Sequence, residues 1–366
     1  MCSLPVFAGL DYHDASVRVC VLEGDGRLFA NSDCPNDWQA IAKFVQRFER
    51  PVRAAIESCS GAANLAEELA SRAGWSVALA HPGYVARMKQ NPDKTDYHDA
   101  RMVADLERVG YLPKVWLAPH YIRELRHLVR YRQQLTEQRR ACKLRLRSLL
   151  REQRCRPPEG LNPWTRAWSA WLANTAALTE QGRYLVDKHR NELERLAKEI
   201  VEVELRLGKV TADDHEVQRL QKQRGIGPVT AWTMRAEIGR FDRFHSGKQL
   251  SRFCGLSPRN ASSGERQADA GLIHAASPAL RAVLIEAAHR LIRYDAEWQS
   301  FAGRLRQAGK PASVIAAAVA NRWMRRLYHT MKLPPAELAA AEGHRAGVSL
   351  ASCQRPGASL PAPGPR

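Results

Sequence analysis

Residues 6–12 read Val-Phe-Ala-Gly-Leu-Asp-Tyr, an apolar run that carries a carboxylate at Asp11. A run of this length and composition predicts a buried strand. A carboxylate within such a run costs free energy unless it is paired or bound to a cation. The run therefore predicts the first strand of a sheet, with a candidate cation ligand near its end.

The following residues alternate between strand and helix patterns. Asp25-Gly26 is a hairpin signal, and Asn36-Asp37 can cap a helix. The expected elements are strands at 16–23, 27–32, 52–56 and 75–80, and helices at 37–48, at 61–72, from 84, and at 96–108. Three hairpin-linked strands, then helix, strand, helix, strand and helix, are the order of an RNase H-like α/β domain. Sugar kinases and actin-like ATPases share this core, so the order alone does not identify the chemistry.

Three further carboxylates fall where this fold would bring them toward Asp11. Glu57 ends the fourth expected strand, and Asp96 and Asp99 stand three residues apart on one helical face. In an RNase H-like sheet the first and fourth strands are neighbours, and the last helix crosses beside their ends. Four such carboxylates suit Mg²⁺ or Mn²⁺, and two ions would activate the attacking oxygen and stabilise the leaving one in phosphodiester chemistry.

Each acid also has an ordinary interpretation. Asp11 can start a turn, Glu57 can cap the next helix, and Asp96 and Asp99 can be solvated residues at a helix start. All four occur in the expected elements and in the expected order. We therefore favour the metal site.

The charge of the chain indicates a polyanionic partner. Lysine and arginine outnumber aspartate and glutamate 56 to 38, which gives a net charge of +18 and an isoelectric point near 9.9. Nucleic acid is the leading candidate partner, and a generally basic surface is the alternative. Residues 121–156 hold twelve Lys/Arg against three Glu, so half of the excess charge lies in this segment.

Two observations bear on the compartment. No segment approaches the roughly 18 apolar residues that a membrane span needs, and residues 1–10 lack the pattern of a secretory signal. The eight cysteines form no CxxC pair and no Cys/His cluster with zinc spacing. We expect reduced, mostly buried thiols in a cytoplasmic protein without a membrane partner.

The middle of the chain is expected to be helical. Apolar residues recur there with a/d heptad spacing, which is typical of a coiled coil. An antiparallel helical hairpin, self-paired or dimerising, is the natural interpretation. Tryptophans at helical spacing between its two arms favour packing over base stacking. The residues concerned are Leu128, Leu135, Cys142 and Leu149 in the first arm, Val186, Leu193, Leu196, Ile200, Val203, Leu207 and Val210 in the second, and Trp164, Trp168 and Trp171 between them.

A third, mostly helical unit is expected from about residue 213 to 332. It opens with Gly225-Ile-Gly227, a short turn into a helix that can seat a phosphate on backbone N–H groups, as helix-hairpin-helix modules do. A plain helix–helix turn is the alternative. Further on, Ser262 and Ser263 precede Gly264 in a polar loop, where serine is usually a turn residue. No histidine-based triad surrounds them, which argues against ester or peptide hydrolysis.

These motifs resemble one known family, the DEDD transposases of insertion-sequence family one-ten with its one-eleven-eleven subgroup. The resemblance spans roughly residues 5–330. It rests on Asp11, on Ile56-Glu57-Ser58, on Lys94-Thr-Asp96-x-x-Asp99-Ala100, on Gly225-Ile-Gly-Pro-Val-Thr-Ala231, on Phe253-Cys-Gly-Leu-Ser-Pro-Arg259 and on Ser263-Gly264. One stretch departs from the family: His274-Ala-Ala-Ser277 stands where relatives usually have a lysine and a Gly-Asn pair, although Arg281 is retained.

The resemblance implies a mechanism and partners. A serine, Ser263 with Ser262 as the alternative, attacks a DNA phosphate and holds the strand covalently while metals bound to Asp11, Glu57, Asp96 and Asp99 assist. A structured bridge RNA pairs with donor and target DNA. The carboxylate domain of one protomer meets the serine domain of another, in an assembly from dimer to tetramer.

The expected organisation combines the residue patterns, including the Ala-, Pro- and Gly-rich composition after residue 332, with the resemblance. We expect a RuvC-like DEDD catalytic domain at 1–115, a basic coiled-coil domain at 116–212, a mostly helical transposase domain at 213–332 and a disordered tail at 333–366, in a bacterial protein associated with the nucleoid. The main alternative is a hydrolytic RuvC-like nuclease or Holliday junction resolvase, in which the carboxylates activate water. A non-enzymatic nucleic-acid binder and an actin-like kinase are weaker alternatives.

Overall fold

The computed structural model describes residues 4–88, 95–260, 269–273 and 276–332. Lys94, Ser262, Ser263, His274 and the expected tail at 333–366 lie outside the described residues. The chain divides into two compact units, one within Met1–Ala118 and one at Pro119–Lys332.

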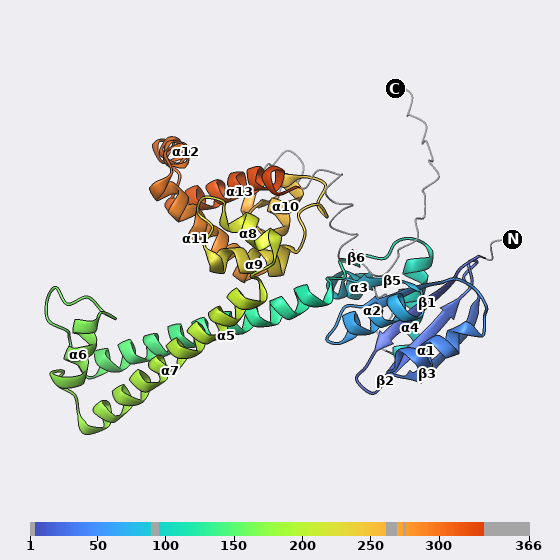
Figure 1. The fold of residues 1–366 in the computed structure, drawn as a ribbon, viewed down its shortest axis with the longest axis horizontal. Coiled ribbons are helices and arrows are strands. Elements are labelled where there is room, and N and C mark those ends of the chain that lie inside the picture. Colours follow the sequence, from blue (N-terminus) through green and yellow to red (C-terminus); the bar gives the residue numbers. More distant parts are fainter. Residues whose placement is uncertain (1–3, 89–94, 261–268, 274–275, 333–366) are drawn as a thin grey trace. The chain divides into compact units, whose positions relative to one another are not determined.

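A six-stranded mixed sheet forms the first unit (Figure 1). Its strands lie in the order β3-β2-β1-β4-β5-β6, with β1 antiparallel to β2 and parallel to β4. This confirms the expected RNase H-like order and the pairing of the first and fourth strands. The sequence pattern did not indicate β6, because two residues are too short to show an alternation. The strands are β1 (Val6–Tyr12), β2 (Ser16–Leu22), β3 (Leu28–Pro35), β4 (Val52–Glu57), β5 (Ser76–Ala80) and β6 (Lys114–Val115).

The two faces of the sheet carry different helices. Ala8, Leu10 and Ile56 belong to a core formed with α1 (Trp38–Gln46) and α2 (Ala62–Arg72). Residues of opposite parity face α4 (Asp96–Arg108): Phe7 packs with Ala100 and Ala104, and Ala55 packs with Val103. Side chains alternate along a strand, so Asp11 and Glu57 share the face of the sheet that α4 covers. Helix α3 (Pro82–Met88) follows β5.

Helix α4 approaches β1 closely because the strand has a glycine at the crossing point. A Cβ atom at Gly9 would lie 1.9 Å from the Ala100 carbonyl oxygen and 2.5 Å from the Ala104 nitrogen. At the other end of the helix, buried Glu107 forms ion pairs with Arg53 at 2.6 Å and with Lys114 at 2.8 Å. These contacts determine where the first turn of α4, with Asp96 and Asp99, lies relative to the sheet.

Gly9→Ala tests this packing. The added methyl group would force α4 away from β1, and we expect it to lower the free energy of unfolding by about 1–3 kcal/mol. DNA cleavage should fall as well, because α4 carries Asp96 and Asp99. Urea unfolding midpoints and cleavage rates measure the two effects. Gly24→Ala is the matched control, since nothing lies within 4 Å of a Cβ atom there. Equal midpoints for the two variants would contradict the role of Gly9.

Two long helices open the second unit, α5 (His120–Glu152) and α7 (Glu180–Val210) (Figure 1). They lie side by side and run in opposite directions, since Arg132 contacts Glu204 while Cys142 contacts His189. Four residues of the expected seam, Leu135, Leu196, Ile200 and Val203, form a buried cluster. The seam is less covered at its end, where Val210 is 48% exposed.

The tryptophans lie at the far end of this helix pair, around α6 (Arg166–Asn174). Trp168 is buried with Leu146 and Val186, and Trp164 and Trp171 pack against the same cluster. The interpretation of these rings as packing residues is therefore confirmed.

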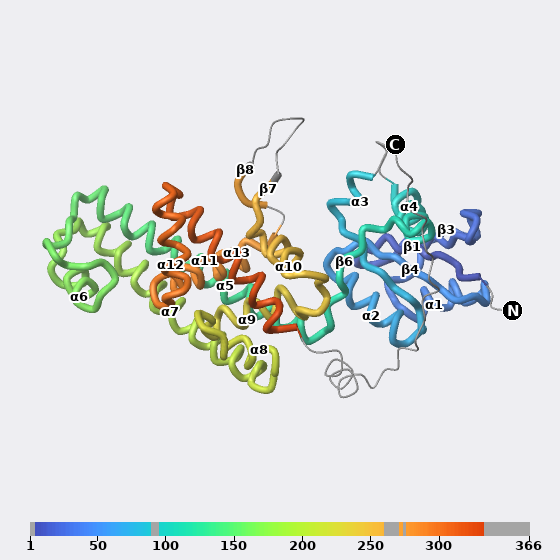
Figure 2. Tube along the Cα trace, turned by 90° about the horizontal axis from the view of Figure 1, so that it is seen from above, coloured from blue at the N-terminus to red at the C-terminus, as the bar shows by residue number. Residues whose placement is uncertain are grey.

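The rest of the second unit is a helical bundle with a short two-stranded ribbon. Nearly the whole of α9 is buried at its centre, from Thr230 to Ile238. The ribbon, β7 (Pro258–Asn260) with β8 (Asp269–Leu272), stands beside α10 in Figure 2 and was expected to be a loop. Strands of three and four residues are too short for a sequence pattern. The helices are α8 (His215–Gln221), α9 (Pro228–Ile238), α10 (Gly247–Phe253), α11 (Pro278–Tyr294), α12 (Ala296–Gln307) and α13 (Ala312–Met331).

Most of the described cysteines are buried, as expected. Cys20, Cys34, Cys142 and Cys254 are buried and free, whereas the free thiol of Cys59 is exposed. Among the helices that the structure describes, none is both long and apolar enough to cross a membrane.

Candidate functional site

Three potential metal ligands gather where β1 ends and α4 begins. His13 Nε2 lies 3.4 Å from Asp11 Oδ2 and 3.5 Å from Asp96 Oδ2. Asp11 is the least exposed of the three, at 19% of its side chain, against 50% for His13 and 54% for Asp96. The group therefore combines one shielded carboxylate with two side chains that solvent and substrate can reach.

His13 was not among the residues predicted from the sequence. His13 lies just beyond β1. Its backbone N–H donates to the Ser16 carbonyl oxygen, and its carbonyl oxygen accepts a hydrogen bond from the Asn36 side-chain amide. These bonds hold the turn between β1 and β2. The available signal was its spacing, because residues i and i+2 of a strand point to the same face, and His13 follows Asp11 by two.

Asp96 and Asp99 are placed by the start of α4. Thr95 is the N-cap, and its side chain accepts a hydrogen bond from the His98 N–H. The Asn31 side-chain amide donates to the Tyr97 carbonyl oxygen at 3.0 Å, which joins this turn to β3. Two carboxylates in the first turn are also favoured by the positive end of the helix dipole.

Glu57 ends β4 beside Asp11. The two strands pair in parallel register up to Leu10 and Ile56, so Asp11 and Glu57 are the next residues along each strand. Partial desolvation raises the pKa of the nearby Cys59 thiol, and both carboxylates raise it further. The tight group of ligands among the described residues contains Asp11, His13 and Asp96; Asp99 and Glu57 surround it at longer range.

The surroundings of Asp11 disfavour its charged form. Burial raises its pKa above the ordinary value; His13 partly offsets this, and Asp96 and Asp99 raise the pKa further. Gathering several carboxylates in one place is unfavourable unless a positive charge joins them.

The donor set fits a divalent ion. Ligands that hold one ion at about 2.1 Å stand about 3.0–3.5 Å from each other, which matches the distances of His13 from Asp11 and from Asp96. Carboxylate oxygens suit Mg²⁺ and Mn²⁺, and an imidazole nitrogen adds a donor that Mn²⁺ accepts more readily than Mg²⁺ does.

The Gly-x-Gly turn of the second unit has the expected form. It joins α8 to α9, with Gly225 at a φ of 84° and Gly227 as the N-cap of α9. A phosphate at this helix start stays a prediction. Arg281, which the resemblance retains, donates to the Ile273 carbonyl oxygen at 2.9 Å and so holds the base of the ribbon.

An RNase H-like sheet with carboxylates at the ends of β1 and β4 defines a class: enzymes that transfer phosphoryl groups on nucleic acids through divalent metals. Comparisons with known proteins narrow the class. The DEDD transposase model of the IS110 family matches residues 8–154, and the model described as "Transposase IS116/IS110/IS902 family" matches residues 217–302.

Individual relatives agree. The "Probable family 20 transposase" of Pseudomonas aeruginosa is 28% identical over 76% of this chain and 83% of its own length. The transposase for insertion sequence element IS1328 of Yersinia enterocolitica is 27% identical over 75% of this chain and 82% of its own length. The transposase for insertion sequence element IS1111A of Coxiella burnetii is 27% identical over 65% of each chain, just under two thirds.

This chain belongs to the IS110 family of DEDD transposases, the family one-ten that its motifs resemble. It is a transposase of an insertion sequence, a DNA phosphoryl-transfer enzyme whose DEDD domain implies a divalent metal.

Proposed function

We propose that this transposase is a bridge-RNA-guided recombinase that cuts and rejoins DNA through Ser263. Divalent metal ions held by Asp11, Glu57, Asp96 and Asp99 would assist. The observation that supports this most strongly is the gathering of Asp11 and Asp96 at the end of β1, with Glu57 on the neighbouring strand. When bound, Mg²⁺ or Mn²⁺ would supply Lewis-acid stabilisation of the charge that develops on the phosphate.

The proposed chemistry conserves the phosphodiester bond. The Ser263 hydroxyl oxygen attacks phosphorus and forms an ester, and the deoxyribose oxygen that leaves takes a proton. Attack by a hydroxyl of a second strand then releases the serine and rejoins DNA without ATP. A base-pairing RNA would select the sites, so the protein needs contacts to backbones more than to bases.

The covalent intermediate separates this proposal from hydrolysis. Radiolabelled DNA is incubated with the full chain, its RNA and Mg²⁺, and the reaction is stopped in denaturant. A recombinase leaves label on the protein, in a peptide that contains Ser262 and Ser263. Cleaved DNA without labelled protein would instead support the hydrolytic nuclease, in which water is the nucleophile.

The remaining organisation is part of the same proposal. The domains are taken as 1–115, 116–212, 213–332 and 333–366, with α5 and α7 forming an antiparallel coiled coil. The assembly is a dimer to tetramer in which carboxylates of one protomer meet the serine of another. The chain would act in the bacterial cytoplasm, on the nucleoid.

The presence of His13 predicts that the metal site prefers Mn²⁺ to Mg²⁺. If its imidazole joins Asp11 and Asp96 around one ion, His13→Ala should lower Mn²⁺ affinity by roughly tenfold or more and change Mg²⁺ affinity much less. Calorimetric titration of the full chain with each ion measures both. Lys43→Gln is the charge-altering control, because Lys43 is exposed on α1, which covers the other face of the sheet. Unchanged Mn²⁺ affinity in His13→Ala would exclude His13 as a ligand.

The arginines of the basic segment at residues 121–156 fall into two groups, one paired within the protein and one exposed. Arg126 donates to the Ala236 carbonyl oxygen, Arg130 pairs with Glu237 and Arg132 pairs with Glu204, so these arginines join α5 to its own unit. Lys143 lies 4.7 Å from the centre of the Trp164 ring, and burial lowers its pKa. Exposed arginines occupy the later turns of α5, at 140, 145, 147 and 151.

We expect these exposed arginines to contact nucleic-acid phosphates. Replacing Arg140, Arg145, Arg147 and Arg151 with Gln should lower the slope of log affinity against log salt by about 0.7–0.9 for each phosphate that is no longer neutralised. Filter binding of RNA and duplex DNA across a salt series measures the slope. Changing Arg130 and Arg132 should lower stability instead, because both are paired. An unchanged slope in the quadruple variant would show that these four arginines face solvent and do not contact phosphates.

A further inference from the structure

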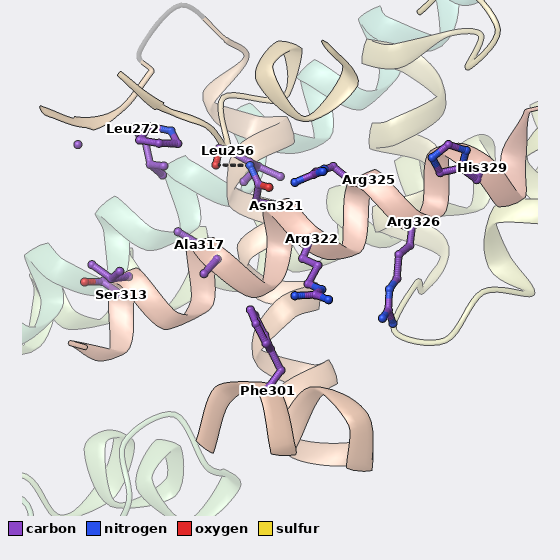
Figure 3. Close-up of a pocket in the computed structure, with 14 residues that line it drawn as sticks. Leu256, Leu272, Phe301, Ser313, Ala317, Asn321, Arg322, Arg325, Arg326 and His329 are labelled. Carbon is purple, nitrogen blue, oxygen red and sulfur yellow. Dashed lines mark hydrogen bonds between the residues drawn. The ribbon is translucent and has the colours of Figure 1, made fainter. Parts of the chain in front are cut away.

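A groove of about 1060 Å³ runs along α13 in the helical bundle of the second unit (Figure 3). Leu256, Pro258, Gly271 and Leu272 of the ribbon and its base line one side, and Phe301 of α12 lines another. This groove is far from the carboxylates in sequence, and neither the metal site nor the glycine turn uses it.

The face of α13 in the groove changes character along the helix. Its lining residues form two adjacent rows spaced by four, 313–317–321–325–329 and 314–318–322–326. The first two turns are small or apolar, with Val314, Ala317 and Ala318, and the last turns are basic, with Arg322, Arg325 and Arg326 followed by His329. No acidic side chain occurs among the described residues that line the groove. One end therefore suits apolar surface and the other suits anions.

The arginines differ in how they are held. Arg326 forms an ion pair with Glu297, and the Arg322 guanidinium lies 5.1 Å from the centre of the Phe301 ring. Arg325 has no ion-pair partner in the part of the chain that the structure describes. In Figure 3 Arg322 extends toward Phe301, whereas Arg325 extends toward Asn321. Two exposed guanidinium groups, those of Arg322 and Arg325, thus lie within one groove with no ion pair to a carboxylate of the described residues.

The groove is tied to the ribbon that leads to the serine segment. The Asn321 side-chain amide donates to the Leu256 carbonyl oxygen at 3.0 Å, which fixes the base of β7 on α13. Asn260 pairs with Asp269 at the other end of the ribbon. Ser263 follows Asn260 by three residues, and three residues span at most about 11 Å. Pro258, which lines the groove, precedes Ser263 by five residues, so the chain can place the serine no more than about 18 Å from this end of the groove.

We propose that this groove binds a single strand of DNA, the strand whose phosphate Ser263 attacks; this rests on the serine chemistry proposed above. Phosphates lie against Arg322, Arg325 and His329, and bases lie against Phe301, Leu272 and the small residues of α13. A basic track beside an aromatic ring is the combination that binds single strands without sequence preference. Residues of the ribbon and of α12 line the groove beside α13, which favours one strand over a duplex.

Equilibrium binding tests the groove without metal or chemistry. The probe is a fluorescein-labelled oligothymidylate of twelve nucleotides, and the protein is the full chain in EDTA. Arg322→Gln with Arg325→Gln should weaken binding by roughly tenfold and lower the salt slope by about 1.4, the value for two phosphates on a single strand. Arg306→Gln with Lys310→Gln removes the same charge from exposed positions outside the groove and should leave the slope nearly unchanged.

A second variant changes shape without charge. Ala318→Trp fills the apolar half of the groove and should weaken binding while leaving the salt slope intact. Wild-type affinity in both the arginine and the tryptophan variants would overturn the proposal. Equilibrium binding of the oligonucleotide requires neither Ser263 chemistry nor metal, so a failure to detect the covalent species in other experiments does not change the binding result. Conversely, normal binding by these variants leaves the serine proposal standing.

Photo-crosslinking identifies the strand. Equal amounts of a DNA 12-mer with 5-iododeoxyuridine and an RNA 12-mer of the same sequence with 5-iodouridine compete for the chain. DNA attached at Phe301, in the tryptic peptide 294–304, supports the proposal. RNA attached there in preference to DNA would overturn it, as would the absence of either adduct at Phe301 together with normal binding by the variants.

Discussion

Asp11→Asn should abolish DNA cleavage in Mg²⁺, with a rate at least about 10³-fold below wild type, since several kcal/mol of transition-state stabilisation are lost. Asparagine keeps the size of the side chain and removes the charge that a cation needs. Binding of RNA should persist, because the exposed arginines of α5 are untouched. Gel assays of cleavage and filter binding on the same preparation measure both quantities. Cleavage at the wild-type rate would exclude a metal site at Asp11.

The same substitution has an opposite effect on stability, which separates lost chemistry from lost fold. Burial raises the pKa of Asp11 in the folded state, so the folded protein favours the protonated form. Wild type therefore loses stability as pH rises from the ordinary aspartate range through the raised folded pKa. Asp11→Asn lacks this titration and should be at least as stable near pH 7 in EDTA. Adding Mg²⁺ should raise the melting temperature of wild type only.

Ser263→Ala should abolish strand exchange and the covalent protein–DNA species, while RNA binding stays at the wild-type level. A serine hydroxyl is a weak nucleophile without a base or a metal, and a covalent intermediate divides one difficult step into two easier ones. Only Glu265 is an ionisable neighbour in sequence that could act as a base, so activation must come from elsewhere in the assembly. Denaturing gels of labelled DNA report the covalent species. Strand exchange by Ser263→Ala would move the assignment to Ser262, and activity of the double alanine variant would exclude serine chemistry.

Mixing two inactive variants tests whether the site is shared between protomers. Ser263→Ala subunits keep intact carboxylates, and Asp11→Asn subunits keep an intact serine. If one protomer supplies each half, mixed assemblies should recover part of the activity that neither variant shows alone. The control is a chain that carries both substitutions, mixed with Ser263→Ala, which restores no complete site. Recovery there, or none in the first mixture, would contradict the composite site.

Most of the first unit could be predicted from local patterns. Strand alternation at 16–22, the Asp25-Gly26 turn and the Asp37 cap each act within a few residues, so their outcomes are visible in the sequence. The same holds for the positions of Asp11 and Glu57, because strand order and parity place them on one face. The tryptophans beside α6 were likewise predicted as packing residues from their helical spacing.

Other features depend on which distant residues meet. His13 belongs to the acidic group only because the start of α4 brings Asp96 within 3.5 Å of it, and α4 reaches that place because Gly9 has no side chain. The groove on α13 exists because Asn321 ties the ribbon to the helix, and strands of three and four residues leave no periodic signal. Periodicity reports the face on which a residue lies; close packing between elements determines what that face contacts.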